Sequence, residues 1–227
     1  MLKSIFLPVL VLFLSHASYA ADDIMPSSCQ TDAKLQGLRS KELQSLYQGD
    51  QDDRKEIEAH LDRKWPMKMM QKMAKNDANR RRRVADIFAE GCINSAADYA
   101  AAAMVYQHGI APDHFFQTFL WSKRAVELGD PTQKHLMALG IDRYLMNINQ
   151  KQLFGSQAKK LNNDDTCWCL WPVEPTFPSA KRAEYLGQSV DQKMSWLKDI
   201  NGKNQCPVAE CKVDAKPTLS GFVPGFW

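Results

Sequence analysis

The chain has 227 residues, of which 44% are hydrophobic and 24% charged, with a formal net charge of +3. A balance this close to neutral argues against nucleic acid and against other polyanions as general partners. The length fits one folded domain, or one domain with an extension.

Residues 1–20 have the pattern of a secretory signal peptide. Lys3 gives a short positive start, residues 5–14 form an apolar run, and small residues precede a cleavage site after Ala20. The apolar run is about 10 residues long, whereas a membrane span needs roughly 20. We therefore expect a mature chain of 207 residues (227 less 20), with a net charge of +2 because Lys3 is lost. We expect it in the periplasm or outside the cell, with no membrane span after cleavage.

Helical periodicity is clearest in the middle of the chain. Three consecutive segments carry it: 96–109, 113–129 and 130–146. Ser95 followed by Asp98 makes a capping box at the start of the first segment. Gly109 and Gly129 stand where a left-handed C-terminal cap is expected. These boundary signals predict three well-defined helices.

The sequence as a whole predicts an all-α fold. We expect a compact multi-helix domain with helices packed as hairpins, followed by an irregular extension braced by disulfides. Gly49-Asp50 is expected to break an early helical run. The predicted organisation has three parts: a signal peptide (1–20), a helical domain (21–160), and a region with a linker, a segment rich in Trp, Pro and Cys, one helix and an irregular tail (161–227).

All the cysteines follow the signal peptide. They are Cys29, Cys92, Cys167, Cys169, Cys206 and Cys211. An even number of cysteines in an exported chain predicts up to three disulfides. A zinc cluster and redox chemistry are alternatives, although the spacings do not follow the usual Cys-x-x-Cys pattern of zinc sites. The pairing does not follow from the sequence, because six cysteines allow 15 arrangements.

Two short runs have both a structural and a functional interpretation. The run 80–83 consists of four arginines, which on a helix point to all sides and so favour a solvated helix start over a single anion-binding patch. Met67, Met70 and Met73 are spaced by three, as thioether ligands of copper could be. Methionines at such spacing also fill a hydrophobic core, which is the interpretation we favour. We predict no metal site and no cofactor.

Polar residues interrupt apolar helical faces at two places. His108 shares a face with Ala101 and Met104, and Asp142 with Arg143 lies within an otherwise apolar run. Buried groups of this kind are tolerated only when they are paired and hydrogen-bonded. We therefore expect His108 and Asp142 to meet inside the helical bundle. The structural interpretation is a polar network that fixes how helices and a loop dock.

Four short motifs occur in order along the chain. They are Asp50-Gln51-x-x-Arg54, Gln107-His108, Asp142-Arg143 and Gln152-x-Phe154-Gly155-Ser156-Gln157. Over roughly residues 35–197 this order resembles a bacterial domain family of unknown function. The motifs of that family are Asp-Gln-x-x-Arg, Gln-His, Asp-Arg and Gln-x-Tyr-Gly-Thr-Gln. Here Phe154 lacks the hydroxyl of the family's tyrosine, whereas Ser156 keeps that of its threonine. The resemblance implies one shared site and brings no activity with it.

A second resemblance covers only residues 100–125 and their flanks. The alanines of this stretch, with Tyr106, Gly109, Trp121 and Gly129, are similar to the helical pairs of SEL-one-like and tetratricopeptide proteins. Only one such pair is recognisable, whereas a stable solenoid needs about three repeats. The resemblance implies helix–turn–helix packing and a possible role in binding protein.

Three hypotheses of function follow. The leading one is a binding protein for a small molecule or a protein, with a polar pocket. The residues of that pocket are Asp50, Gln51, Arg54, Gln107, His108, Asp142, Arg143, Gln152 and Gln157. The second is a hydrolase in which His108 acts as acid or base and Asp142 orients it. The third is a purely protein-binding helical module with a concave apolar or aromatic groove. No common catalytic motif occurs, so the sequence leaves catalysis undecided.

Overall fold

The computed structural model describes residues 28–58, 67–161, 167–202, 206 and 210–227, so the predicted signal peptide lies outside the described residues. Within them the protein is mostly helical, which confirms the predicted fold class. The helices are α1 (Ser28–Thr31), α2 (Ala33–Glu58), α3 (Met67–Ala89), α4 (Ala96–Gln107), α5 (Pro112–Glu127), the 3₁₀ turn η1 (Pro131–Gln133), α6 (Lys134–Asn147), α7 (Ser179–Leu186) and α8 (Val190–Gly202). The strands are β1 (Ala158–Lys160) and β2 (Trp168–Leu170), paired antiparallel.

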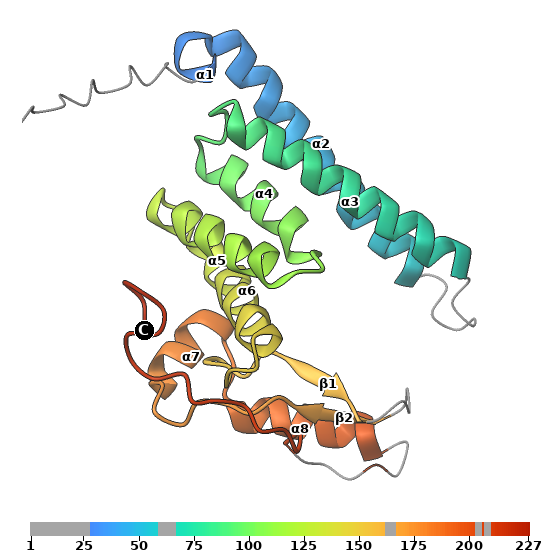
Figure 1. The fold of residues 1–227 in the computed structure, drawn as a ribbon, viewed down its shortest axis with the longest axis vertical. Coiled ribbons are helices and arrows are strands. Elements are labelled where there is room, and N and C mark those ends of the chain that lie inside the picture. Colours follow the sequence, from blue (N-terminus) through green and yellow to red (C-terminus); the bar gives the residue numbers. More distant parts are fainter. Residues whose placement is uncertain (1–27, 59–66, 162–166, 203–205, 207–209) are drawn as a thin grey trace, which may run out of the picture.

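The helices are stacked as hairpins along the long axis of the molecule (Figure 1). The α2–α3 pair forms one end, the α4–α5 pair follows, and α6 packs against α5. The two-stranded sheet, α7 and α8 form the other end. No described helix is both long and apolar enough to cross a membrane.

The ends of the middle helices follow their local sequence closely, with one exception. The capping box of Ser95 and Asp98 is formed in both directions, and Gly129 is left-handed with φ of 101°. Gly109 is not in the left-handed region, so that prediction was wrong. Glycine is needed here because the backbone lies close to His114: a Cβ at this position would lie 2.3 Å from the Cβ of His114.

Helix α2 runs without interruption through Gly49 and Asp50, so the predicted break there was wrong. Aspartate disfavours a helix interior when its carboxylate bonds to the nearby backbone instead. Here the carboxylate of Asp50 is held by Gln51, Arg54 and His108. Tertiary contacts therefore outweigh a local cost of about 1 kcal/mol for glycine in a helix.

The apolar core has two parts, which meet where α4, α5 and α6 pack together. The first lies between α2, α3, α4 and α5, and its buried residues include Leu43, Val84, Ile87, Val105 and Trp121. The second lies between α5, α6 and the C-terminal region, and its buried residues include Phe119, Ile141, Leu145, Phe154 and Phe177. Phe226 and Trp227 pack against this second part, so the end of the chain contributes to the core.

The crossing of α5 and α6 depends on a glycine, which gives a test of the packing. A Cβ on Gly140 would lie 2.9 Å from the backbone nitrogen of Phe119 and 3.2 Å from the carbonyl oxygen of Phe115. Because backbone cannot move aside as a side chain can, we expect Gly140→Ala to lower the free energy of unfolding by about 1–3 kcal/mol. Urea unfolding would measure this loss.

Gly37 in α2 provides the matched control for that substitution. It is exposed, and a Cβ there would have no heavy atom within 4 Å. Gly37→Ala is therefore expected to raise stability by about 0.5–1 kcal/mol through helix propensity alone. Equal effects of the two substitutions would contradict the tight α5–α6 contact.

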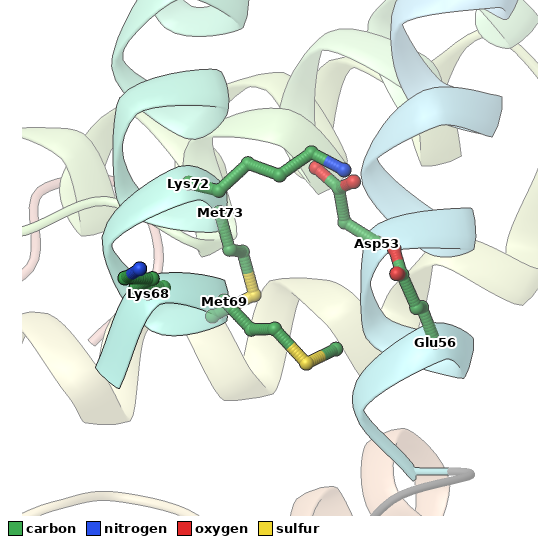
Figure 2. A pocket seen from close by; sticks show the side chains of 6 residues that line it. All are labelled: Asp53, Glu56, Lys68, Met69, Lys72 and Met73. Carbon is green, nitrogen blue, oxygen red and sulfur yellow. The ribbon is translucent and has the colours of Figure 1, made fainter. Parts of the chain in front are cut away.

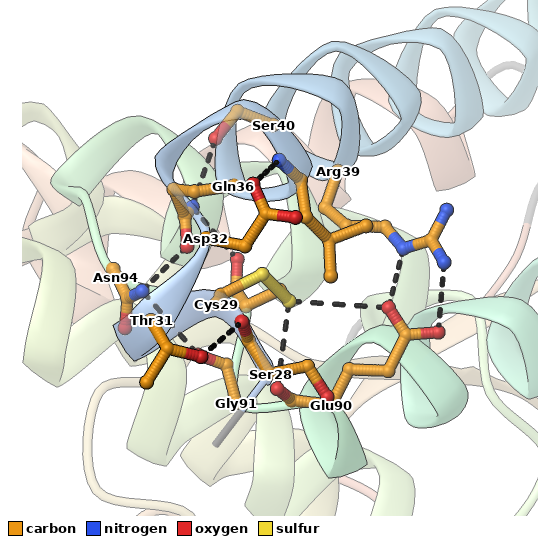
Figure 3. The surroundings of a disulfide bond; sticks show 12 residues. Ser28, Cys29, Thr31, Asp32, Gln36, Arg39, Ser40, Glu90, Gly91 and Asn94 are labelled. Carbon is orange, nitrogen blue, oxygen red and sulfur yellow. Dashed lines mark hydrogen bonds and ion pairs between the residues drawn. A yellow bond between two sulfur atoms is a disulfide. The ribbon is translucent and has the colours of Figure 1, made fainter. Parts of the chain in front are cut away.

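All six cysteines are paired, as predicted for an exported chain. The disulfides are Cys29–Cys92, Cys167–Cys206 and Cys169–Cys211. The first fastens α1 to the segment after α3. Beside it, Gln36 donates to the carbonyl of Cys92 and Arg39 donates to Glu90 (Figure 3). The other two bind the C-terminal region together around β2 and α8.

Candidate functional site

The imidazole of His108 lies at the C-terminal end of α4 and faces α2. Its Nδ1 is 3.0 Å from both carboxylate oxygens of Asp50, which is fully buried. The same carboxylate accepts from Gln51 and pairs with Arg54 at 3.1 Å, so it acts only as an acceptor. Nδ1 therefore donates to this carboxylate, which leaves Nε2 for other partners. Nε2 has no hydrogen-bond partner among the described residues.

Arg54 connects this pair to helix α3. Its guanidinium donates to both oxygens of Asp77, at 3.2 and 2.8 Å, while Arg80 joins Asp77 to Asp53 at 2.7 and 2.6 Å. Burial would raise the pKa of Asp77, but hydrogen bonds and charges from the two arginines outweigh it and hold this pKa below its ordinary value. The network thus fixes the position of Arg54 and, through it, of Asp50.

Asp142 lies on α6 and faces the loop 152–157 instead of His108. One of its oxygens accepts from the backbone N–H groups of Leu153 and Phe154, at 2.8 and 2.9 Å, and the other accepts from Ser156 at 2.9 Å. Its side chain is fully buried. Burial raises the pKa of this carboxyl, and the three N–H donors act in the opposite direction. Asp142 is therefore the anchor of the loop.

Gln152 braces the same loop from inside. Its amide donates to the carbonyls of Gln157 and Trp171, at 3.0 and 2.6 Å, and accepts from the backbone N–H of Gln157 at 2.8 Å. Gln152 is fully buried and its amide is satisfied at both ends. The loop is thus held rigidly against α6 by two buried side chains.

Arg143 joins the loop to the end of α4. It donates to the carbonyl of Gln107 at 2.7 Å and to the amide oxygen of Gln157 at 3.3 Å. Its guanidinium lies over the ring of Phe115, 5.5 Å from the ring centre. The side-chain oxygen of Gln107 is buried and has no partner within the described part of the chain.

The nine residues of the predicted pocket thus fall into two groups of contacts, one around Asp50 and His108 and one around Arg143 and the loop 152–157, and they also divide by exposure. Gln107, Gln152 and Gln157 are buried, as are the carboxylates of Asp50 and Asp142. The four half-buried residues are Gln51, Arg54, His108 and Arg143. These four are the most exposed of the nine.

The expected partnership of His108 with Asp142 is replaced by one with Asp50. Asp142 does not orient the imidazole in this arrangement because its carboxylate faces the backbone N–H groups of the loop 152–157. Asp50 takes that role, since it reaches Nδ1 from α2. The exposed edge of the imidazole is consequently set by α2 and α4, not by α6.

Of two further residues of this region, Asp77 was not singled out from the sequence and Arg81 was considered only as part of the arginine run. Asp77 holds Arg54, and Arg81 donates to the carbonyl of His108 at 2.8 Å. The helical spacing of Asp77, Arg81 and the buried Val84 places them near one face of α3, which could have distinguished Arg81 from its neighbours. The prediction that the arginine run is a solvated helix start was wrong, because the run lies inside α3 and Arg81 is buried. Arg83 pairs with Glu42 at 2.6 Å.

Two cavities lie away from the nine residues of the predicted pocket. One, of about 170 Å³, opens between α2 and α3, where the sulfur atoms of Met69 and Met73 lie below the side chain of Lys72, which points towards Asp53 (Figure 2). The other, of about 240 Å³, lies between α2, α4 and the turn before α6. Its lining consists of Gln44, Tyr47, Ala97, Ala100, Ala101, Met104, Asp130 and Gln133.

The methionine run does not form a buried core. Met67 and Met70 are exposed, whereas Met69 and Met73 are half-buried and line the smaller cavity. Within the described ranges, no group of three or more His, Cys, Asp or Glu side chains is arranged to hold a metal ion.

No protein-family model, curated protein or solved structure matches this chain. The two resemblances noted in the sequence therefore remain predictions, and the function has to be argued from the geometry.

Proposed function

We propose that the chain is an exported binding protein, periplasmic or secreted, whose recognition surface is the half-buried polar face at the C-terminal end of α4. This surface consists of Gln51, Arg54, His108 and Arg143. The three disulfides of the chain support export, because such bonds persist in oxidising compartments.

The observation that carries the proposal is the state of the His108 side chain. A buried carboxylate fixes its ring, and 24% of the side chain is exposed with Nε2 free to accept or donate. A side chain needed only for packing would gain stability by satisfying both nitrogens. A fixed ring with one free nitrogen can instead form a hydrogen bond with a group of another molecule.

His108→Gln tests this role, since glutamine can still donate to Asp50 but lacks the imidazole. We expect the free energy of unfolding to change by less than about 1 kcal/mol, as for a half-exposed position. His135→Gln on α6 is the matched control, because His135 is exposed. A loss of several kcal/mol in His108→Gln alone would show that His108 is structural.

Binding is measured on the same proteins by NMR. The imidazole resonances of His108 are followed while common amino acids, monosaccharides, dicarboxylic acids and nucleotides are added. We expect at least one class of compound to shift the His108 signals saturably and to lose affinity in His108→Gln but not in His135→Gln. If none of these compounds moves the His108 signals, the small-molecule form of the proposal fails.

A hydrolase is the second candidate, and the tautomer of His108 favours it. With the hydrogen on Nδ1, the lone pair of Nε2 can take a proton from water, which is what a general base requires. In that case Asp50→Asn and His108→Gln would both abolish hydrolysis of chromogenic esters, glycosides or phosphates. Activity that survives both substitutions would exclude this role.

A further inference from the structure

Two guanidinium groups flank the C-terminal end of α4. Arg81 from α3 donates to the carbonyl of His108 at 2.8 Å, and Arg143 from α6 donates to the carbonyl of Gln107 at 2.7 Å. Carbonyl oxygens of consecutive helical residues are roughly 3.5 Å apart, so the two donor nitrogens lie within roughly 9 Å of each other. Both charges therefore belong to the same end of the helix.

Neither guanidinium forms an ion pair with a carboxylate in the described ranges. Asp50, Asp53 and Asp77 are engaged by Arg54, Arg80 and His108. Asp142 is engaged by backbone N–H groups of its loop.

A comparison with Arg182 shows the lack of negative neighbours around Arg143. Burial lowers the pKa of Arg143, and no neighbouring carboxylate opposes this effect. For Arg182, by contrast, Asp142 and Glu174 act against burial.

The helix itself supplies only part of the missing negative charge. Its C-terminus is equivalent to about half a negative charge, against the two positive charges of Arg81 and Arg143. Asp50, Asp53 and Asp77 exceed their partners Arg54 and Arg80 by one negative charge, but none of these carboxylates pairs with Arg81 or Arg143. The ring of Phe115 offers Arg143 a further, weaker attraction. A largely buried charge without a counter-charge is unfavourable. A negative group from outside the chain would remove this imbalance.

Both guanidinium groups retain free donors for such a group. Each has five N–H bonds. Arg143 uses Nε and Nη1, and Arg81 uses Nη1, while their other N–H groups have no partner among the described residues. The planar arrangement of these donors suits the oxygens of phosphate and carboxylate.

We infer that the recognition surface around His108 takes an anionic small molecule, whose phosphate or carboxylate group is bound by Arg143 and Arg81. The free Nε2 of His108 can accept or donate, so it suits a hydroxyl or amine group of the same molecule. This inference rests on the proposed binding function and specifies its ligand class.

The test is a titration of the disulfide-bonded protein with inorganic phosphate and, separately, with acetate. Sodium chloride keeps the ionic strength constant, because unspecific attraction depends on it. The side-chain Nε–H signals of Arg81 and Arg143 and the imidazole signals of His108 are followed by NMR. We expect at least one anion to shift the signals of both arginines saturably, and the two arms of the titration identify the preferred group.

Arg143→Met should weaken binding of the preferred anion by about tenfold or more, since charged hydrogen bonds are lost. Arg124→Met is the matched control, because Arg124 is exposed and paired only with Glu127. If Arg143→Met does not fold, Arg143→Lys replaces it. That variant keeps the charge but loses the planar fork, and it should bind phosphate or acetate measurably more weakly than the unchanged protein.

Shifts that do not saturate, or that are equal in the Arg143 and Arg124 variants, would overturn the inference. The inference can also fail while the proposed binding function stands. If neutral compounds move the His108 signals saturably while phosphate and acetate do not, the surface binds a ligand but not an anionic one.

Discussion

Asp142→Ala is expected to lower the free energy of unfolding by about 3–5 kcal/mol, because it removes the carboxylate that accepts from three backbone N–H groups of the loop. Those groups belong to Leu153, Phe154 and Ser156, of which the first two are buried. Without the carboxylate they lose their acceptor in a region closed to water. Urea unfolding followed by circular dichroism measures the loss.

Asp142→Asn separates hydrogen bonding from side-chain volume. The amide has nearly the same shape, but its NH₂ group must face at least one backbone N–H donor, so we expect a loss of about 1–3 kcal/mol. Asp86→Ala on α3 is the control, since Asp86 is 57% exposed and should change stability by no more than about 0.5 kcal/mol. An Asp142→Ala protein as stable as this control would mean that the loop does not depend on the carboxylate.

Removing the Cys29–Cys92 disulfide by a double substitution to alanine should cost about 4 kcal/mol. The two cysteines are 63 residues apart, and the entropy of the unfolded chain lost by closing a loop of that length gives this magnitude. No other disulfide joins α1 and α2 to the rest, so no second bridge compensates for its loss. Unfolding in urea of the unchanged and doubly substituted proteins provides the measurement.

The same experiment has an internal comparison. Cys167–Cys206 and Cys169–Cys211 span 39 and 42 residues and overlap along the chain, so the loss of either one leaves the other closing nearly the same loop. We expect a smaller loss from removing Cys167–Cys206 than from removing Cys29–Cys92. Equal losses would show that loop closure is not the main contribution.

The helix boundaries in the middle of the chain were predictable because their signals are local. The capping box of Ser95 and Asp98 and the left-handed Gly129 involve residues within one turn of each other. Gly109 was misjudged because its requirement is a contact with His114 across the turn, which spacing alone does not show. The continuity of α2 at Asp50 was missed for the same reason, since its partner His108 is 58 residues away.

The candidate site shows the same division between local and long-range information. That polar groups from distant segments would meet followed from the cost of burying them singly. Which groups would meet did not follow, because Asp50 and Asp142 are both carboxylates facing apolar surroundings. Only the packing of α2 on α4 assigns Asp50 to His108, and only the path of the loop 152–157 assigns Asp142 to backbone donors.

The order of the disulfides along the chain has a consequence for biosynthesis. Cys29 and Cys92 are consecutive cysteines, so they join correctly even when cysteines are oxidised in their order along the chain. The other two bridges interleave, because Cys169 lies between Cys167 and its partner Cys206. If oxidation proceeds strictly in the order of emergence, it links Cys167 to Cys169 first. The C-terminal region therefore depends on a thiol–disulfide isomerase, or on acquiring its fold before its thiols are oxidised.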